Sequence, residues 1–333
     1  MSVTSYPNLS LPVAAGLIGT GYAAKLRAET LQADERSQLV AVAGHTPEHT
    51  AEFAQTHGTE AAQSWQKLIE RPDLDLVFIC GVNRDHGPMV QAALAADKHV
   101  VVEYPLALDI DLATALIDLA QQRQRLLHVE HIELLGGLHG AMREYLPQVG
   151  QPYYARYSTI NPQHPAPRRW TYHSDLFGFP LMAALSRVHR LTDLFGQVAE
   201  VNCQFVSDRA TDGYFTSCLC TAQLSFATGF VAEVTYGKGE KLWAAARRME
   251  VHAEQAGLLF EGENGTLLTP DGTQPIEVGT RRGLFAKDTR SVLDHLTTGT
   301  PLYVSPAASL YALRVADAAR RSAQTGQRIS LLG

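Results

Sequence analysis

Residues 12–33 read PVAAGLIGTGYAAKLRAETLQA, and this stretch decides the fold of the first part of the chain. Its apolar start predicts a short buried strand over residues 12–18, and the remainder predicts a helix over residues 22–33. Between them, Gly19–Ala24 has the spacing G-x-G-x-x-G/A. The first glycine permits a tight turn, the second lets the backbone approach a pyrophosphate, and the helix N-terminus attracts the same anion. We therefore expect a dinucleotide site, with a merely tight strand–helix turn as the alternative.

The end of the second predicted strand bears on the choice between NAD and NADP. Residues 43–46 read AGHT and contain no Asp or Glu. An acidic side chain at this place would bind the ribose 2′-hydroxyl and repel a 2′-phosphate, whereas His45 and Thr46 can donate to one. The sequence thus favours NADPH over NADH, although the stretch has no Arg. The alternative is that Thr46 only caps the following helix.

Strands and helices alternate through the first part of the chain. The strands are short and rich in Val, Ile and Leu, which is typical of a parallel sheet covered by helices on both faces. The expected strands are 12–18, 38–43, 76–80, 98–103 and 126–131, and the expected helices are 22–33, 46–58, 86–96 and 111–125. This pattern predicts a doubly wound α/β domain over residues 1–128.

The second part of the chain has a different pattern, with alternating strands separated by turn residues. It predicts an α+β domain over residues 129–333, built on one large, open, mostly antiparallel sheet. The expected strands are 153–160, 200–207, 220–227, 229–237, 248–254 and 257–269, with a hairpin signal at Glu263-Asn264-Gly265. Helices are expected over 175–195 and, near the C-terminus, over 307–325.

Composition excludes several classes of protein. The 333 residues are 45% hydrophobic and 19% charged, as in globular domains with buried cores. Lys and Arg total 28 and Asp and Glu total 34, and the resulting net charge of −6 argues against a nucleic-acid-binding surface. No apolar run reaches the roughly 18 residues that a membrane helix needs. Residues 1–12 lack the cationic start of a signal peptide, and the four cysteines fit no zinc pattern, so we expect a cytoplasmic protein with reduced thiols.

Three segments together resemble the Gfo/Idh/MocA oxidoreductases: Gly19–Ala24, FICGVNRDH (78–86) and KHVVVEYPLAL (98–108). The resemblance spans the whole chain and implies an N-terminal Rossmann domain followed by a substrate domain with an open sheet. It also implies a set of cofactor-binding residues. These are Gly19, Thr20, Gly21, Tyr22, Ala23, Gly44, His45, Thr46, Cys80, Val82, Asn83, His86 and Glu103.

The chain departs from this family where the family keeps its proton relay. Members typically carry Glu-Lys-Pro after the fifth strand, but here Tyr104 replaces the Lys. In LMAALSRVHR (181–190), Ala183 stands at the position of the family's Asp and Arg187 at that of its His. Alcohol oxidation needs a base with a pKa near the working pH, which neither Ala nor Arg provides. A sugar or inositol dehydrogenase is therefore not expected.

The departures resemble the biliverdin reductase family, most closely its bacterial and cyanobacterial branch. The segments are EYPLAL (103–108), LHVEHIELL (127–135), YYARYSTI (153–160) and SRVHR (186–190). The resemblance implies NADPH-dependent hydride transfer to the central methine carbon of biliverdin, which gives bilirubin. It implies Arg187 and Tyr104 as residues that are both catalytic and substrate-binding. Arg187 would stabilise the negative charge that develops and could also clamp a propionate, and Tyr104 would stack on the bilin or hydrogen-bond it. A surface Arg and a Tyr packed at the domain junction are the alternatives.

Other residues are candidates for the substrate site. Arg169 and Trp170 combine a cation with an aromatic ring, which suits propionates and flat pyrroles, although a loop packed on the sheet is as good an explanation. His131 is expected to line the crevice or to form a satisfied buried pair with Glu130. Because these two residues alternate along a strand, a metal site is not expected. The directions of Tyr157, Tyr236 and Lys238 stay open.

Two other functions remain open from the sequence. One is reduction of a different conjugated or imine substrate, and the other is a non-catalytic regulator that binds a bilin or NADPH. The expected partner is the small molecule biliverdin, with no nucleic acid and no membrane. A monomer is expected if the bilin occupies the open sheet, and a homodimer through that sheet is the alternative.

Overall fold

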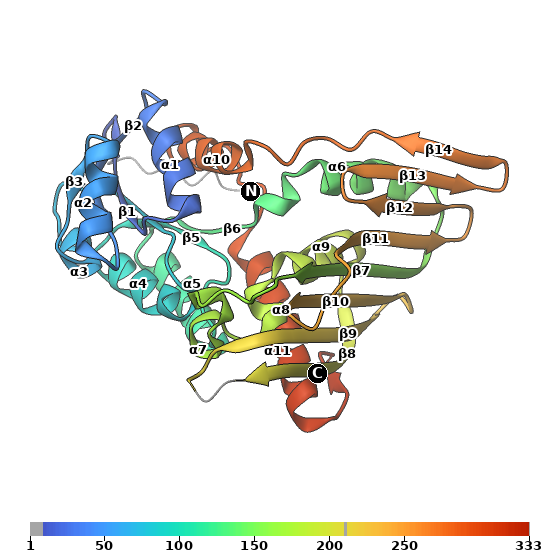
Figure 1. The fold of residues 1–333 in the computed structure, drawn as a ribbon. Helices are drawn as coiled ribbons and strands as arrows, with labels where there is room; N and C mark the ends of the chain where they lie inside the picture. The colour runs from blue at the N-terminus through green and yellow to red at the C-terminus, as the bar shows by residue number, and fades with distance from the viewer. Residues whose placement is uncertain (1–8, 210–211, 333) are drawn as a thin grey trace. The chain divides into compact units, whose positions relative to one another are not determined.

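A computed structural model describes residues 9–209 and 212–332 (Figure 1). Most of the N-terminal stretch that lacks a signal-peptide pattern lies outside these residues. The chain forms two compact units. The first contains the chain up to Ile132 together with Gly283–Leu310, and the second contains Glu133–Arg282 together with the chain from Tyr311 onward. The sequence prediction groups residues 129–333 together, whereas the structure groups Gly283–Leu310 with the first unit.

The first unit is built on a six-stranded parallel sheet with the order β3-β2-β1-β4-β5-β6. The strand order reverses between β1 and β4, and doubly wound sheets bind ligands beside such a point, at the carboxyl ends of the strands. The strands are β1 (Val13–Ile18), β2 (Ser37–Ala43), β3 (Glu60–Ala61), β4 (Leu76–Ile79), β5 (His99–Glu103) and β6 (Leu127–Glu130). The helices between them are α1 (Tyr22–Gln32), α2 (Pro47–Thr56), α3 (Trp65–Ile69), α4 (Asn83–Ala95) and α5 (Ile110–Gln122). The predicted doubly wound domain is confirmed.

A helix from late in the chain completes the core of this unit. The helix α10 (Leu284–Thr298) contributes Val292, Leu293 and Leu296 to the cluster formed by β1, α1 and β4. The sequence pattern does not predict α10. Two of its buried positions are Asp288 and Thr289, which interrupt the apolar spacing that would reveal a helix.

The second unit is built on a nine-stranded sheet with the order β14-β13-β12-β11-β7-β10-β9-β8-β15 (Figure 1). Its pairs are antiparallel except for β7 with β10, which run parallel. The strands are β7 (Pro152–Pro162), β8 (Val198–Arg209), β9 (Phe215–Phe226), β10 (Val231–Gly239), β11 (Ala246–Ala253), β12 (Gly257–Glu261), β13 (Asn264–Thr269), β14 (Gly272–Ile276) and β15 (Ile329–Ser330). The large, mostly antiparallel sheet is confirmed.

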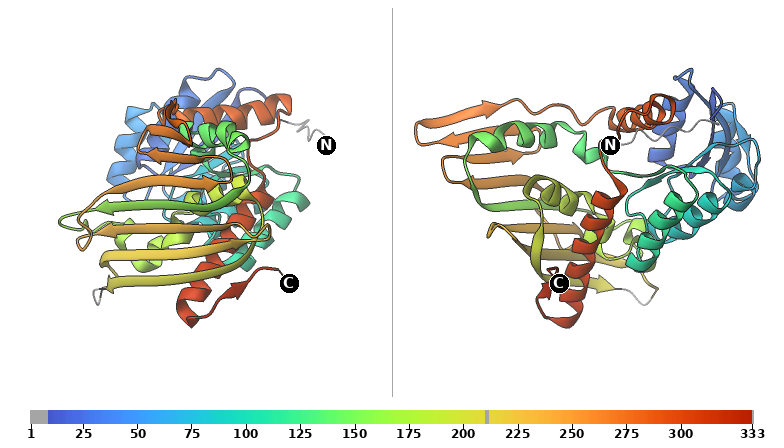
Figure 2. Two further views of the ribbon diagram at one scale, coloured as in Figure 1. Left: turned by 90° about the vertical axis from the view of Figure 1, so that its right-hand side faces the viewer. Right: turned by 180° about the vertical axis from the view of Figure 1, so that it is seen from behind.

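Helices cover only one face of this sheet. Ala222, Leu224, Ala232 and Val234 are buried toward that face, while the residues between them are more exposed. Figure 2 shows α9 and α11 on this side, and Ser322 of α11 accepts a hydrogen bond from the backbone of Cys203 on β8. The helices of the second unit are α6 (Gly137–Tyr145), α7 (Ser174–Phe177), α8 (Pro180–Ala183), α9 (Ser186–Phe195) and most of α11 (Pro306–Thr325).

Local differences from the sequence prediction have simple causes. The helical stretch 175–195 is three short helices, because Gly178 has a φ of +84° and Pro180 starts a new helix. The hairpin turn lies at Gly262-Glu263, one residue before the predicted signal, and Gly262 has a φ of +63°. Among the residues that the structure describes, no helix combines the length and apolarity needed to cross a membrane.

Candidate functional site

The glycine turn after β1 has the geometry that its spacing predicts. Gly19 has a φ of +126°, and a Cβ atom added there would lie 2.6 Å from the carbonyl oxygen of Cys80. No other residue fits this position without a shift of the backbone. At Gly21 an added Cβ would meet no protein atom within 4 Å. The small residue at Gly21 thus leaves open space in front of the turn.

This open space lies at the N-terminus of α1. Gly21 caps the helix without a side-chain hydrogen bond, and the first turn has no acidic residue. The N–H groups of the first turn and the positive end of the helix dipole therefore face the space that Gly21 leaves. These features fit the pyrophosphate of a dinucleotide.

At the end of β2 the structure leaves the predicted phosphate donors available. His45 is exposed, and Thr46 is the N-cap residue of α2 but its side chain makes no capping hydrogen bond. A Cβ at Gly44 would lie 2.5 Å from the hydroxyl oxygen of Thr50, so this position is closely packed. The alternative role of Thr46, a side-chain cap, is not what the structure shows.

Several of the expected cofactor residues hold the loops at the strand ends. The buried ring of His86 lies with Nδ1 2.8 Å from the carbonyl oxygen of Pro105 and Nε2 3.2 Å from that of Gly81. Burial lowers the pKa of His86 and raises that of the Cys80 thiol. Val82 and Asn83 form the cap and first residue of α4. His86 thus shapes the two loops that follow β4 and β5.

A buried ionic network that the sequence pattern does not predict lies behind these loops. Arg27, fully buried on α1, donates to Glu103 Oε1 at 2.9 Å and to Asp288 Oδ2 at 2.8 Å. His128 Nε2 lies 2.7 Å from Asp288 Oδ1, and the hydroxyl of Tyr303 donates to the same oxygen. The carboxylate of Glu103 is therefore fixed by Arg27. The signal in the sequence was a charged residue on the apolar face of α1, between Ala24 and Leu31.

Tyr104, which follows β5, stacks on a histidine ring that is itself held by a hydrogen bond. Its ring stacks on that of His131, with centroids 5.4 Å apart and 9° between the planes. His131 Nε2 lies 2.8 Å from Ser309 Oγ, and its backbone N–H donates to Tyr303. Burial, with Glu103 nearby, raises the pKa of Glu130 well above its usual range. His131 therefore supports Tyr104 from within the first unit.

In the second unit, Arg187 lies on α9 against the helix-covered face of the sheet. Its guanidinium is 5.5 Å from the ring centre of Tyr236 and donates to Ser186 Oγ at 3.0 Å. Ala183, at the end of α8, is buried. Tyr157, Tyr236 and Lys238 also face this side, which answers the question that the sequence left open.

An aromatic box encloses Lys238 beside Arg187. Its ammonium is 3.5 Å from the ring centre of Phe177 and 4.6 Å from that of Tyr172. It donates to the carbonyl oxygen of Thr171. Burial, reinforced by Arg169 and Arg187, lowers the pKa of Lys238 to about 7.

The loop before this box carries the other predicted substrate residues. The guanidinium carbon of Arg169 lies 5.9 Å from the ring centre of Tyr172. The ring centres of Trp170 and Phe177 are 6.3 Å apart. Cations and aromatic rings thus gather on the helix-covered face of the sheet. In the described residues no group of three or more His, Cys, Asp or Glu side chains is arranged to hold a metal.

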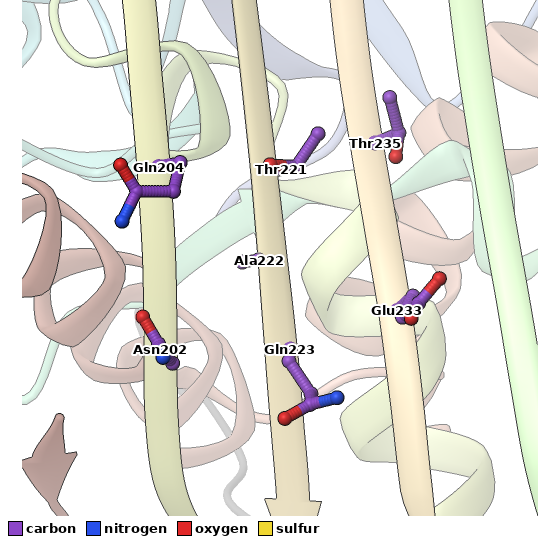
Figure 3. A pocket seen from close by; sticks show the side chains of 7 residues that line it. All are labelled: Asn202, Gln204, Thr221, Ala222, Gln223, Glu233 and Thr235. Carbon is purple, nitrogen blue, oxygen red and sulfur yellow. The ribbon is translucent and has the colours of Figure 1, made fainter.

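The open face of the sheet has a different character. Figure 3 shows polar side chains from β8, β9 and β10 around a shallow depression. Its lining residues are Asn202, Gln204, Thr221, Ala222, Gln223, Glu233 and Thr235. This lining has neither a cation nor an aromatic ring, so it does not suit a flat dicarboxylate.

Comparison with known proteins agrees with this geometry. The model of the oxidoreductase family with an NAD-binding Rossmann fold matches residues 13–131, and that of its C-terminal alpha/beta domain matches residues 147–331. The crystal structure of biliverdin reductase from Synechocystis sp. PCC 6803, in complex with biliverdin and NADP+, is 52% identical, with a TM-score of 0.92, and the match covers 94% of this chain and 99% of that chain.

Mammalian relatives match over shorter stretches. Biliverdin reductase A of Homo sapiens is 29% identical over 157 residues, which cover 47% of this chain and 50% of the human protein. The protein of the same name from Mus musculus is 28% identical over 201 residues, 60% of this chain and 63% of the mouse protein. The chain thus spans about half of the human relative and under two thirds of the mouse relative.

The two family models cover the glycine turn, the parallel sheet and the nine-stranded sheet. The chain therefore belongs to the Gfo/Idh/MocA family of oxidoreductases.

Proposed function

We propose that this protein is an NADPH-dependent biliverdin reductase, which converts biliverdin, NADPH and a proton into bilirubin and NADP+. The observation that carries the proposal is the 52% identity, over nearly all of both chains, to a reductase crystallised with biliverdin and NADP+. The glycine turn and the cationic, aromatic face of the second unit are what such a reaction requires.

The chemistry differs from alcohol oxidation. Bound NADPH supplies a hydride to the central methine carbon, and an electron pair of the conjugated system moves toward a pyrrole nitrogen, which takes up a proton. No alcohol is deprotonated, so the relay that Tyr104, Ala183 and Arg187 replace is not needed. A fixed cation that stabilises the developing negative charge is useful instead.

Arg187 is the residue that we assign to this role. A guanidinium keeps its charge at any working pH because its pKa exceeds about 12, so it stabilises negative charge but does not donate the proton. Packing on Tyr236 and the hydrogen bond to Ser186 fix its position. We assign the proton to ordered water or a neighbouring group.

For the cofactor, we propose that Gly19, Thr20, Gly21, Tyr22 and Ala23 hold the pyrophosphate. We propose that Gly44, His45 and Thr46 hold the 2′-phosphate, so NADPH is preferred to NADH. Cys80, Val82, Asn83, His86 and Glu103 then shape the nicotinamide end, with Arg27 holding the carboxylate of Glu103.

For the substrate, we propose that Tyr104 stacks on or hydrogen-bonds the bilin, with His131 supporting its ring. We also propose Arg169 and Trp170 as bilin-binding residues. We further propose that the protein is a cytoplasmic monomer, although the sequence-based reason for a monomer, a bilin on the open sheet, does not apply to the proposed site. The open face of the sheet presents Gln204, Gln223 and Glu233, and interface cores are usually depleted of charged side chains. Light scattering tests the oligomeric state.

A visible absorbance assay tests the proposed function. Protein, NADPH and biliverdin should lose the long-wavelength bilin band as bilirubin forms. Arg187→Ala should lower kcat by about 10²–10³, the usual cost of one electrostatic contact to the transition state. Arg187→Lys should restore part of the activity, because an ammonium lacks the planar fork. Near-native turnover of Arg187→Ala, with NADPH binding intact, would show that another residue is the cation.

A further inference from the structure

One carboxylate in the second unit is shared by three arginines from three different parts of the chain. Glu133 accepts a hydrogen bond from Arg190 Nη2 on α9 at 3.2 Å and another from Arg281, in the segment after β14. Arg247 Nη2 on β11 lies 3.7 Å from the same carboxylate. These three guanidinium groups and Glu133 are called the Glu133 cluster below.

The Glu133 cluster carries more positive than negative charge. Within the described part of the chain, no other carboxylate forms an ion pair with Arg190, Arg247 or Arg281, so two positive charges are not compensated. Arg187 is near enough to add to the effect, because it too lowers the pKa of Glu133. In a protein with a net charge of −6, such an excess is a local feature.

Burial makes this excess costly unless an anion binds. The side chain of Arg190 is 1% exposed and lies 5.4 Å from the ring centre of Tyr157. Its Nε and Nη1 atoms have no hydrogen-bond partner among the described residues. Burial, together with Arg281 and Arg190, lowers the pKa of Arg247. A second carboxylate beside the cluster would relieve this repulsion.

The backbone fixes the segment that carries Arg281. The N–H of Gly137, at the start of α6, donates to the carbonyl oxygen of Thr280 at 3.4 Å. A Cβ atom added at Gly137 would lie 1.9 Å from the carbonyl oxygen of Gly279, so the two chain segments touch through their backbones. Arg281 is thus held beside Glu133 by the fold, as a preorganised binding group would be.

Arg247 and Arg281 remain accessible, with side chains 30% and 41% exposed. We propose that these two guanidinium groups form a subsite for a carboxylate of the substrate, and that Glu133, itself fixed by Arg190, holds them in place. This inference rests on the proposed function, and the carboxylate is then a propionate side chain of the open-chain tetrapyrrole. Paired N–H groups on a guanidinium match the two oxygens of a carboxylate.

The test compares biliverdin with its dimethyl ester, in which both propionates are neutral. Dissociation constants are measured by absorbance titration for native protein, Arg247→Gln and Arg281→Gln. Each variant should bind biliverdin roughly 10- to 100-fold more weakly, since a charge-assisted hydrogen bond is lost. Binding of the ester and the KM for NADPH should stay within about twofold. Added salt should weaken the binding of biliverdin more than that of the ester.

Arg248→Gln is the matched control. Arg248 neighbours Arg247 on β11, points to the other face of the strand and pairs with Glu250 and Glu261. The Arg248→Gln variant should leave the dissociation constants for biliverdin and for its dimethyl ester unchanged. The proposal is overturned if native protein binds acid and ester equally, or if both cluster variants keep native affinity for biliverdin. If native protein binds biliverdin through these residues but does not reduce it, the subsite stands and the proposed function fails.

Discussion

Lys238 is a buried cation whose titration should be visible in the stability of the protein. Its residue is 4% exposed, and within the described residues no carboxylate forms an ion pair with its ammonium. Its ammonium contacts the rings of Phe177 and Tyr172 and the carbonyl oxygen of Thr171. Cys218, Arg169 and Arg187 are near enough to act on its charge. Burial lowers its pKa from 10.5 to about 7. The unfolded chain therefore binds a proton at Lys238 between about pH 7 and 10.5 that the folded protein does not.

The sign and size of the effect follow from this difference. Between those pH values, the free energy of unfolding should rise with pH by about 1.4 kcal/mol per unit from this residue alone. Below about pH 7 the folded protein buries the charged ammonium, so the full free-energy cost of burying that charge lowers its stability. In Lys238→Met the side chain does not titrate, so this pH-dependent contribution to the free energy of unfolding is absent. The stability of this variant relative to the native protein should therefore fall by about 2 kcal/mol from pH 7 to pH 9.

Urea unfolding at pH 6, 7, 8 and 9 measures this difference, and other titrating groups cancel between the two proteins. Lys241→Met is the control, because Lys241 has a side chain 73% exposed and pairs with Asp208 at 2.8 Å. It should run parallel to the native protein at every pH. Parallel curves for Lys238→Met as well would mean that Lys238 titrates normally, and the description of its aromatic box would be wrong.

Four further substitutions separate folding from function. Gly19→Ala should reduce stability, because its Cβ would meet the backbone of Cys80. Gly21→Ala should unfold like the native protein in urea. It should nevertheless bind NADPH at least 10-fold more weakly, since its Cβ enters the space for the pyrophosphate. Equal NADPH affinity in Gly21→Ala would place the cofactor elsewhere. His45→Asp should shift the ratio of kcat/KM toward NADH by repelling a 2′-phosphate, and a native preference for NADH would contradict this. Tyr104→Phe should keep substantial turnover, because the stacking face remains; a loss of about 10²-fold in kcat at unchanged KM would make Tyr104 the proton donor.

The sequence predicts the parts of this fold that depend on neighbouring residues. The turn at Gly19 and Gly21 follows from local backbone needs, and the parallel sheet follows from short apolar strands that alternate with helices. The ion pair between Arg27 and Asp288 could not be predicted in the same way, because 261 positions separate the two residues. Each looks like an isolated polar residue on a helix until the fold brings them together.

The candidate site shows the same limit. The sequence indicates which residue types at Arg187 and Tyr104 replace the family's relay, but not which face of the sheet Tyr236 and Lys238 occupy. In β10, Tyr236 and Lys238 flank Gly237, which is buried as well, so simple alternation of buried and exposed residues fails at this end of the strand. The Glu133 cluster likewise depends on three chain segments that only tertiary structure brings to one carboxylate.

The position of α10 late in the sequence has a consequence for synthesis of the protein on the ribosome. The chain emerges from its N-terminus, so the whole of Glu133–Arg282 is made before the helix that supplies Val292 and Leu293 to the first core. Until then the buried Arg27 has only Glu103 of its two carboxylate partners, and the loss of one partner from a buried ion-pair network is destabilising. The first unit is thus the first to be started, but it stays incomplete until Gly283–Leu310 has been made, after the whole of Glu133–Arg282. A fragment that stops at Ile132 lacks part of its own interior.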